Sequence, residues 1–499
     1  MDQLDEKKPK HRTCYQCEQV TLGDPFCDTC YSKHCEKAYG RCVECNQINT
    51  EKYWCQSCNS KRFQQNFHNW TSGNDVIDKF IQNTQLSAKN HHQILEWMPY
   101  NMFKNPKYIA EGGFGKVYRA SWNSGYILHW DTRCHQWKRR KDGVFVAFKS
   151  LNNSQNVSLE FINEVTIYLK VHKYKISDQI IKCHGISQDP NTKDYIMVMN
   201  FAKRGNLRNS LNNEKTMLYK KYSKKYKFSN LDLSLWTWRH KIFILKHISY
   251  GIGRIHGKDL IHRDLHVGNI VCNNYDLSPR ITDMGLCKPA NYNESENAKN
   301  VIYGVLAYLA PEILRGQNYT KASDIYSFGI IMYEVISGLP PYYDNAHNEL
   351  LALNICEGSR PEFNIKIPQL VLHIIKSCLD ANPSNRPCAK NLSKIFGEWL
   401  ADFSMYMDGR LELIKTELIN QIEETEKINN ISSANDSSSI NKIHPEAVYK
   451  SRPLNFKNLS EPKNSDNYYE IYDNISTKKY SGSLLKSDRS DCLECAIID

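Results

Sequence analysis

The stretch "IHRDLHVGNI", residues 261–270, is the most informative guide to the fold, because it places two polar side chains at a characteristic spacing. Asp264 and Asn269 lie five residues apart. Phosphoryl transfer uses such a pair, in which the carboxylate orients an attacking hydroxyl and the amide oxygen binds a metal ion. His266 stands between them and raises a second question, which is the kind of hydroxyl that accepts the phosphate.

Further motifs follow this stretch along the chain. "ITDMGL" (281–286) supplies Asp283, and carboxylate oxygens are the ligands that Mg²⁺ prefers. "AYLAPEIL" (307–314) contains Glu312, which we expect to pair with Arg386 of "NPSNRP". "ASDIYSFGIIMYEV" reads as an apolar helix that begins near Asp324.

The residues before the stretch predict a phosphate-positioning region. "VFVAFKSL" (144–151) is a strand pattern that ends near Lys149, and Glu164 follows fifteen residues later on a predicted helix. A pair of this type positions ATP phosphates, whereas an ordinary surface ion pair is the alternative interpretation. "YIAEGGFGKVYRA", from Tyr108, suits a hairpin whose glycines let the backbone approach phosphates, with Ala110 at the first glycine position.

In this order and at these distances, the motifs resemble the eukaryotic protein kinase family over residues 98–398. The resemblance implies an α+β, bilobal protein-kinase fold, with a small β-rich N-lobe, a larger α-helical C-lobe, and ATP and Mg²⁺ in the cleft. "GFGKVYRA", "ASDIYSFGIIMYEV" and "NPSNRP" are most similar to the tyrosine-kinase-like branch. The cysteine-rich start joined to such a domain is similar to the expanded kinase families of fungi.

The resemblance also implies roles for single residues. Asp264 is the expected catalytic base, with His266 beside it. Lys149 and Glu164 are the expected ion pair. The expected Mg²⁺ ligands are Asn269 and Asp283. The expected nucleotide contacts come from the glycine loop, the first strands and the hinge, which includes Asn200: Ile109, Gly112, Gly113, Phe114, Gly115, Val117, Ala147, Lys149, Met199, Phe201 and Ala202.

Two positions that bear on the acceptor hydroxyl depart from the family together. Serine/threonine kinases of the family carry Lys at the position of His266 and pair it with a Thr where this chain has Val305. The arrangement typical of tyrosine kinases is absent as well. An imidazole can contact a phosphate oxygen in either charge state, and the alternative is that His266 only fills space.

Arg263 implies control by a phosphorylated activation segment, roughly residues 286–309. Candidate phosphosites in that segment are Tyr292, Ser295 and Tyr303. At Met284 the family usually has Phe, and we expect the flexible apolar Met to pack there without affecting the chemistry.

The first sixty residues contain a duplicated cysteine motif. Every cysteine of the first set recurs 28 residues later, and the two sets are Cys14, Cys17, Cys27 and Cys30, followed by Cys42, Cys45, Cys55 and Cys58. Two Cys-x2-Cys turns complete a tetrahedral zinc site. We therefore predict two structural Zn²⁺ ions per chain in a zinc-ribbon-like module, with a redox dithiol and a cross-braced ligand pairing as alternatives. Cys35 is expected to be a free thiol.

We divide the chain into a charged lead (1–13), the zinc module (14–60), a helical linker (61–97), the kinase domain (98–398), an amphipathic helix (399–428) and a disordered tail (429–499). In the linker, Ser72 is expected to cap a helix that carries Ile77 and Ile81. Leu411, Ile414, Leu418 and Ile422 form an apolar stripe within 410–428. The tail is rich in Ser and Asn, which is typical of disorder.

The net charge of +11 is spread over 119 charged side chains, so it makes no strong case for nucleic-acid binding. Residues 215–228 contain six lysines and no acidic residue, which suits either a solvated loop or docking of an acidic partner. No apolar run reaches the roughly 18 residues of a membrane helix, and no signal peptide is apparent. We therefore expect a cytoplasmic protein.

We interpret the chain as a protein kinase that transfers the γ-phosphate of ATP to a protein hydroxyl. Serine or threonine is favoured over tyrosine, with dual specificity left open. The alternatives are a pseudokinase that acts as a scaffold, and a zinc module that binds ubiquitin or nucleic acid and carries a kinase domain. A regulatory protein could also dock on the zinc module.

Overall fold

The structure is a computed structural model that describes most of the chain. The described residues are 12–13, 16–17, 19–21, 27–112, 115–140, 144–151, 158–172, 179–211, 230–273, 278–292, 302–407, 416–435 and 442–465. They divide into two compact units. Unit one comprises Met1–Ile176 and Lys182–Phe201, and unit two comprises Ser177–Ile181 and Ala202–Asp499.

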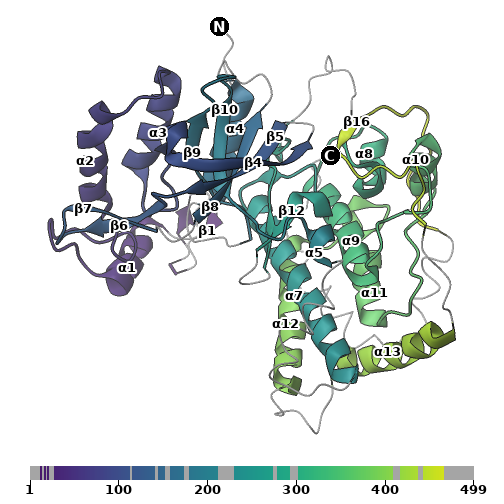
Figure 1. Ribbon diagram of the computed structural model, residues 1–499. Helices are drawn as coiled ribbons and strands as arrows, with labels where there is room; N and C mark the ends of the chain where they lie inside the picture. Colours follow the sequence, from purple (N-terminus) through teal and green to yellow (C-terminus); the bar gives the residue numbers. More distant parts are fainter. Residues whose placement is uncertain are drawn as a thin grey trace. The chain divides into compact units, whose positions relative to one another are not determined.

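Unit one is built on a six-stranded sheet in the order β3-β9-β10-β8-β5-β4 (Figure 1). Its strands are β3 (Glu96–Trp97), β4 (Phe103–Gly112), β5 (Gly115–Trp122), β8 (Val144–Leu151), β9 (Cys183–Gln188) and β10 (Tyr195–Asn200). Alternate residues of β8, Val146 and Phe148, enter one apolar cluster with Trp122 and Val198. This alternation is what a strand with one face on a core requires.

Helix α4 (Leu159–Val171) of unit one carries the predicted Glu164. It begins at Ser158, whose hydroxyl accepts a hydrogen bond from the Phe161 N–H at 3.2 Å. Phe161, Val165 and Tyr168 are buried, and their spacing lines one face of a helix.

The cysteine-rich region folds as two related halves within unit one. Helix α1 (Asp28–Tyr39) begins after Cys27, and α2 (Gln56–Asn66) begins after Cys55. The backbone pairing repeats as well. Thr13 of β1 (Arg12–Thr13) pairs with Val20 of β2 (Val20–Thr21). One repeat later, at the equivalent positions, Arg41 forms a bridge with Ile48. The duplication in the sequence is therefore a duplication of local structure.

The second half of this region packs on a hairpin formed by β6 (Tyr126–Asp131) and β7 (Gln136–Arg140). Trp137 of the hairpin stacks on Phe63 with ring centroids 4.6 Å apart, and it contacts Trp54 at 5.9 Å. Trp54 is fully buried, and its indole N–H donates to the carbonyl of Ala88. The second half of the cysteine region is thus joined to the β6–β7 hairpin by an aromatic core.

The helix predicted in the linker is present, but its capping residue differs from the predicted one. Helix α3 (Asp75–Ser87) is capped by Asn74, whose side chain accepts from the N–H groups of Val76 and Ile77, so the predicted cap at Ser72 is wrong. Ser72 instead donates from its backbone N–H to Asp78. The buried stripe contains Ile77 and Ile81, as the spacing indicates.

Unit two is largely helical (Figure 1). Its helices are α5 (Leu207–Leu211), α7 (Asn230–His256), α8 (Pro311–Leu314), α9 (Lys321–Ser337), α10 (Glu349–Cys356), α11 (Gln369–Cys378), α12 (Ala389–Met407) and α13 (Glu417–Asn435). Helix α9 is buried from Lys321 to Ile336, because it forms the centre of the unit. It is fixed at one end by the Thr320 capping box and at the other by Gly338, which has a positive φ of 75°.

Short strand pairs hold the loops of unit two. They are β11 (Leu260–Ile261) with β14 (Lys288–Pro289), β12 (Ile270–Cys272) with β13 (Pro279–Ile281), and β15 (Ile302–Gly304) with β16 (Arg452–Leu454). The described part of the chain contains no helix with the length and apolar character needed to cross a membrane.

The prediction of a disordered chain from residue 429 onward is wrong in two places. Helix α13 continues to Asn435, and residues 442–465 lie against unit two and include β16. Composition does not show which tertiary contacts a segment makes. Helix α13 is held on α7, because the Glu426 carboxylate accepts hydrogen bonds from Trp238 and Ser234 at 2.9 Å each. Leu418 and Ile422 are buried on the same helix. Leu411 and Ile414 lie outside the described residues.

Candidate active site

The predicted catalytic loop, residues 261–270, is held by one buried carboxylate of α9. Asp324 accepts hydrogen bonds from the backbone N–H groups of His262 at 2.8 Å and Arg263 at 3.0 Å. The Nε2 atom of His256 lies 2.9 Å from the same carboxylate. Arg263 has a φ of +72°, which costs a residue other than glycine roughly 1–3 kcal/mol. The bonds to Asp324 keep the loop in this conformation.

Asp264 and Asn269 meet in this loop as their spacing predicts. The Asn269 Nδ2 donates to the Asp264 backbone carbonyl at 3.0 Å and to Asp264 Oδ2 at 3.1 Å. Both side chains are buried. The amide therefore orients the carboxylate, and Asn269 ends a short 3-10 turn, η3 (Val267–Asn269).

His266 caps this turn and faces Asp264. Its Nδ1 accepts the Gly268 N–H at 3.1 Å, and its Nε2 lies 3.6 Å from Asp264 Oδ2. Gly268 is required by this approach, because a Cβ atom there would lie 2.6 Å from the His266 ring. A neutral His266 with Nδ1 accepting carries its proton on Nε2, the atom nearest the carboxylate.

Asp283 lies two residues after the end of β13, and its neighbour Thr282 links it to Asn269. The Thr282 N–H donates to the Asn269 carbonyl at 2.9 Å. Asp283 has a φ of +62°, and Met284 after it is completely buried. Burial, and then the charges of Asp264 and Asp283, raise the pKa of Tyr303, so this tyrosine lies near both carboxylates.

Unit one brings together the predicted phosphate-positioning pair. The Lys149 Nζ lies 2.7 Å from Glu164 Oε1, and both side chains are buried at 10% and 4% exposure. Lys149 is held in the middle of the sheet, opposite Val117 of β5 and Met197 of β10. Because exposed ion pairs are held loosely, this burial separates Lys149–Glu164 from an ordinary surface pair.

The predicted nucleotide contacts are described only in part. Gly112 and Gly115 face each other at the end of the β4–β5 hairpin, and Ala110 pairs with Val117 in extended backbone, where a methyl group is tolerated. Gly113 and Phe114 lie outside the described residues.

The predicted adenine region lies on neighbouring strands of the same sheet. Ala147 pairs with Met199, and Ile109 is in β4. The predicted hinge residues Phe201 and Ala202 fall in different units, since Phe201 ends unit one and unit two resumes at Ala202.

A second buried ion pair lies in unit two. Arg386 and Glu312 pair through two hydrogen bonds of 2.7 and 2.8 Å, as expected from the sequence. The Arg263 guanidinium lies 4.2 Å from the Tyr319 ring centroid. Of the candidate phosphosites, Tyr292 and Tyr303 are described, whereas Ser295 and the 215–228 insertion lie outside the described residues.

The sulfur atoms of the cysteine region gather in two groups that follow the order of the sequence. Those of Cys42, Cys45, Cys55 and Cys58 all lie within 4.8 Å of one another, and so do those of Cys17, Cys27 and Cys30. The Cys42–Cys58 and Cys45–Cys55 distances of 3.9 and 3.5 Å suit a tetrahedron with metal–sulfur bonds of about 2.3 Å. Cys14 lies outside the described residues, and Cys35 is buried with its thiol toward the Thr50 carbonyl.

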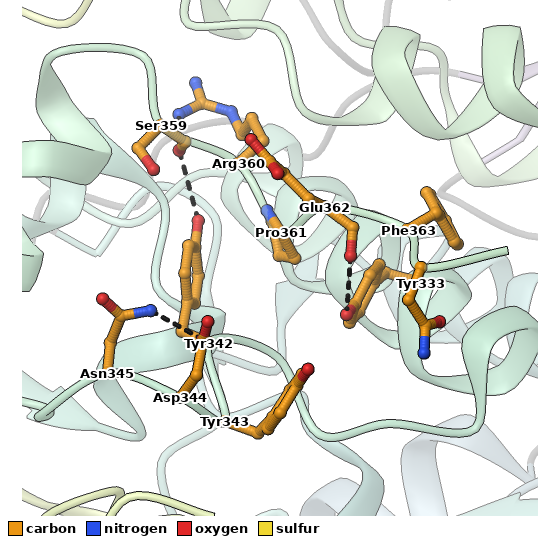
Figure 2. Close-up of a pocket in the computed structure, with 11 residues that line it drawn as sticks. Tyr333, Tyr342, Tyr343, Asp344, Asn345, Ser359, Arg360, Pro361, Glu362 and Phe363 are labelled. Carbon is orange, nitrogen blue, oxygen red and sulfur yellow. Dashed lines mark hydrogen bonds between the residues drawn. The ribbon is translucent and has the colours of Figure 1, made fainter. Parts of the chain in front are cut away.

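Two features of unit two escaped the sequence analysis. Ser451 lies with its hydroxyl against the Asp264 carboxylate, and only its place in a Ser-Arg-Pro-Leu run between basic residues could have drawn attention to it. Figure 2 shows a polar pocket lined by Tyr333, residues 342–345 and residues 359–364, none of which belongs to the catalytic loop. The Tyr342 hydroxyl donates to the Ser359 carbonyl across it.

Comparison with known proteins agrees with this geometry. The family model of protein tyrosine and serine/threonine kinases matches residues 103–396. The chain therefore belongs to the protein tyrosine and serine/threonine kinase family. The sheet-rich and helical parts of the chain fit the predicted bilobal fold.

Curated relatives include kinases of both acceptor classes. The chain is 25% identical over 295 residues to a probable serine/threonine-protein kinase of Dictyostelium discoideum, covering 59% of this chain and 19% of the relative. It is 27% identical over 286 residues to tyrosine-protein kinase SPK-1 of Girardia tigrina, covering 56% and 49%. It is 28% identical over 364 residues to cold-responsive protein kinase 1 of Arabidopsis thaliana, covering 66% and 82%. The chain thus spans half or less of the first two relatives.

Proposed function

We propose that this protein is an active ATP-dependent kinase that phosphorylates serine or threonine hydroxyls of proteins. The observation that carries the proposal is the carboxylate of Asp264, which is buried, oriented by Asn269 and in contact with a serine hydroxyl. A hydroxyl at hydrogen-bond distance from a carboxylate is the arrangement that general-base assistance requires. The tyrosine-kinase-like branch, which contains serine/threonine kinases, accommodates this acceptor.

Each predicted residue has a distinct role in this proposal. Asp264 accepts the proton of the attacking hydroxyl, and Lys149, fixed by Glu164, contacts the phosphates of ATP. Because the Asn269 Nδ2 is engaged by Asp264, its Oδ1 is the atom that would bind Mg²⁺, together with the Asp283 carboxylate. When bound, Mg²⁺ neutralises phosphate charge.

His266 takes the position at which serine/threonine kinases of the family carry Lys. Its Nε2 proton points to the region of Asp264, so it can donate to an oxygen of the transferred phosphate while Gly268 fixes the ring. We assign it a positioning role beside the catalytic base.

The competing interpretation is a pseudokinase scaffold, and the buried Lys149–Glu164 pair argues against it, because burying two charges is costly without a use for them. The test is incubation of the full chain with labelled ATP, Mg²⁺ and casein. Asp264→Ala is expected to lower the rate by roughly 10²–10⁴, the range for a positioned acid or base. Equal labelling by wild type, Asp264→Ala and Lys149→Ala would refute the assignment.

We also propose that the cysteine groups hold two structural zinc ions. The four-sulfur group of Cys42, Cys45, Cys55 and Cys58 has the donors and spacing for this metal, and the first group repeats its order. Zinc bound to thiolates fits the cytoplasmic location expected from the sequence. Metal analysis should find two zinc ions per chain, and Cys58→Ser should leave one, with Cys134→Ser, an exposed cysteine outside both groups, as the control. A metal content that Cys58→Ser does not change would contradict the proposal.

A further inference from the structure

The C-terminal segment, residues 442–465, lies against unit two although the kinase family match ends at residue 396. The proposed catalytic mechanism does not use this segment. Its contacts, taken in order along the chain, show what it does at the site.

The centre of the segment is Ser451, which occupies the position of a phosphoacceptor. Its Oγ lies 2.7 Å from Asp264 Oδ1 and 2.6 Å from Asp264 Oδ2, so its single hydroxyl proton is directed at the proposed base. These are the distances of hydrogen bonds between a hydroxyl and a charged carboxylate. Ser451 therefore contacts a buried carboxylate and does not merely cover the surface.

The backbone after Ser451 binds as an added strand. Residues Arg452–Leu454 of β16 pair antiparallel with Ile302–Gly304 of β15, in the register Ile302 with Leu454 and Gly304 with Arg452. Pairing with an exposed strand edge is a general way to bind extended peptides, because it needs few particular side chains. Leu454 supplies an apolar anchor and is buried.

The residues before Ser451 are held by side chains that flank the site. The Arg208 guanidinium lies 4.4 Å from the Tyr449 ring centroid, and the Tyr449 hydroxyl donates to the Pro341 carbonyl at 2.9 Å. His347 contacts the Val448 carbonyl through Nδ1 at 2.9 Å. Together with the strand pairing, these contacts hold the chain on both sides of Ser451.

The end of the segment is anchored further along unit two. Glu461 forms an ion pair with Arg315, and the Asn464 side chain accepts the Ala381 N–H at 2.8 Å. Gly358 allows this path, since a Cβ atom there would lie 2.6 Å from the Ser465 nitrogen. The segment is therefore held by specific contacts both before and after Ser451.

We infer that Ser451 is a site of intramolecular autophosphorylation and that the unmodified C-terminal segment competes with protein substrates for Asp264. This inference rests on the proposed kinase function. In the reaction, Ser451 Oγ forms a bond to the γ-phosphorus of ATP, and the bond from that phosphorus to the β–γ bridging oxygen breaks. ADP leaves with the electron pair, and the hydroxyl proton passes to Asp264 and then to solvent.

The product should leave the site. A phosphoserine carries a charge of about −1.5 to −2, and at position 451 it would face the Asp264 carboxylate. Like charges at such a distance repel strongly in a partly buried site. Phosphorylation therefore opens the site to other substrates.

The same chain can reach its own site. Helix α13 is fixed to α7 through Glu426, and only residues 436–441 separate the helix from the segment. A short connection gives an effective local concentration of the order of millimolar, so the intramolecular reaction exceeds the intermolecular one at micromolar enzyme.

The experiment uses full-length protein that has been dephosphorylated and freed of phosphatase. It is incubated with ATP and Mg²⁺, with and without casein, and peptide mass spectrometry follows phosphate on Ser451 and on Ser460, a matched serine of the same segment. We expect labelling of Ser451 with a rate constant that does not change over a tenfold dilution. Preincubation with ATP should lower the KM for casein by roughly tenfold, the change produced by a loss of about 1.4 kcal/mol in docking free energy.

Two variants complete the test. Ser451→Ala should retain casein phosphorylation but lose the effect of preincubation. Leu454→Asp places a charge at a buried anchor, so it should slow Ser451 labelling by at least about tenfold while casein is phosphorylated without a lag.

Each other outcome overturns a defined part of the reasoning. Casein labelling without label on Ser451 would overturn the inference and leave the kinase function intact. A Ser451 labelling rate that rises in proportion to enzyme concentration would overturn the intramolecular step. Absence of both labels would overturn the kinase function as well as the inference.

Discussion

Replacing Asp324 by Asn should disable the catalytic loop while leaving the fold largely in place. The change keeps the shape of the side chain but replaces one carboxylate oxygen by an NH2 group. The Asp324 Oδ2 accepts the His262 N–H, and Oδ1 accepts the Arg263 N–H. An Asn side chain can accept only one of these two donors.

The magnitude follows from these contacts. A buried backbone N–H without an acceptor costs about 1–3 kcal/mol, and loss of charge from the second bond removes roughly 1 kcal/mol more. The expected loss of unfolding free energy is therefore about 2–4 kcal/mol. Arg263 is then no longer held at positive φ, so we expect the loop to relax and kcat to fall by about 10²-fold.

The assay combines urea unfolding with steady-state phosphorylation of casein below the unfolding transition. Thr320→Ala is the matched control, because it removes the cap of the same helix at a cost of about 1 kcal/mol without touching the loop. If Asp324→Asn were destabilised as expected but kept a wild-type kcat, the role of Asp324 in holding the catalytic loop would be refuted.

Three further predictions concern single contacts. Arg386→Ala should lower the unfolding free energy by about 3–5 kcal/mol, because it leaves Glu312 buried without a cation, and a loss below 1 kcal/mol in urea unfolding would contradict this. His266→Ala should lower kcat by about tenfold or more through loss of a hydrogen bond to a charged group, and His266→Lys should restore it; full activity of the Ala variant would favour a space-filling role. Burial holds the pKa of His184 well below its usual range. As the pH falls, the unfolded chain therefore binds a proton at this histidine before the folded protein does. The free energy of unfolding should decrease below a pH of roughly 6.5, by about 1.4 kcal/mol per pH unit. His184→Gln, which can still donate to Asn200, should flatten this acid limb in pH-dependent unfolding, and an unchanged slope would disprove the assignment.

The parts of the site that the sequence predicts well are pairs whose members lie on elements with a clear pattern. Lys149 lies on a strand of alternating apolar residues and Glu164 on a helix with an apolar stripe, so a buried pair between them follows from spacing. Asp264 and Asn269 are only five residues apart, and a local turn brings them together. The duplicated cysteines are likewise local, because each half forms its own turn and helix start.

Local patterns fail where a competing contact or a distant partner decides the outcome. Both Ser72 and Asn74 are good helix-capping residues, and Asn74 takes the cap because Ser72 is hydrogen bonded to Asp78. The Ser- and Asn-rich composition after residue 429 predicts disorder, yet Tyr449 in that stretch packs against Arg208, more than two hundred residues earlier.

The sequence by itself determined the protein family, the paired side chains of the proposed site and the two cysteine groups, because motif spacing within single elements specifies them. Only the tertiary structure decided that a serine far beyond the kinase domain meets the proposed catalytic base. Ser451 and Asp264 are 187 residues apart, and no pattern in either stretch refers to the other. Their contact depends on a strand edge at Ile302–Gly304 and on anchors such as Arg208, which become a binding surface only after the helices of unit two have packed.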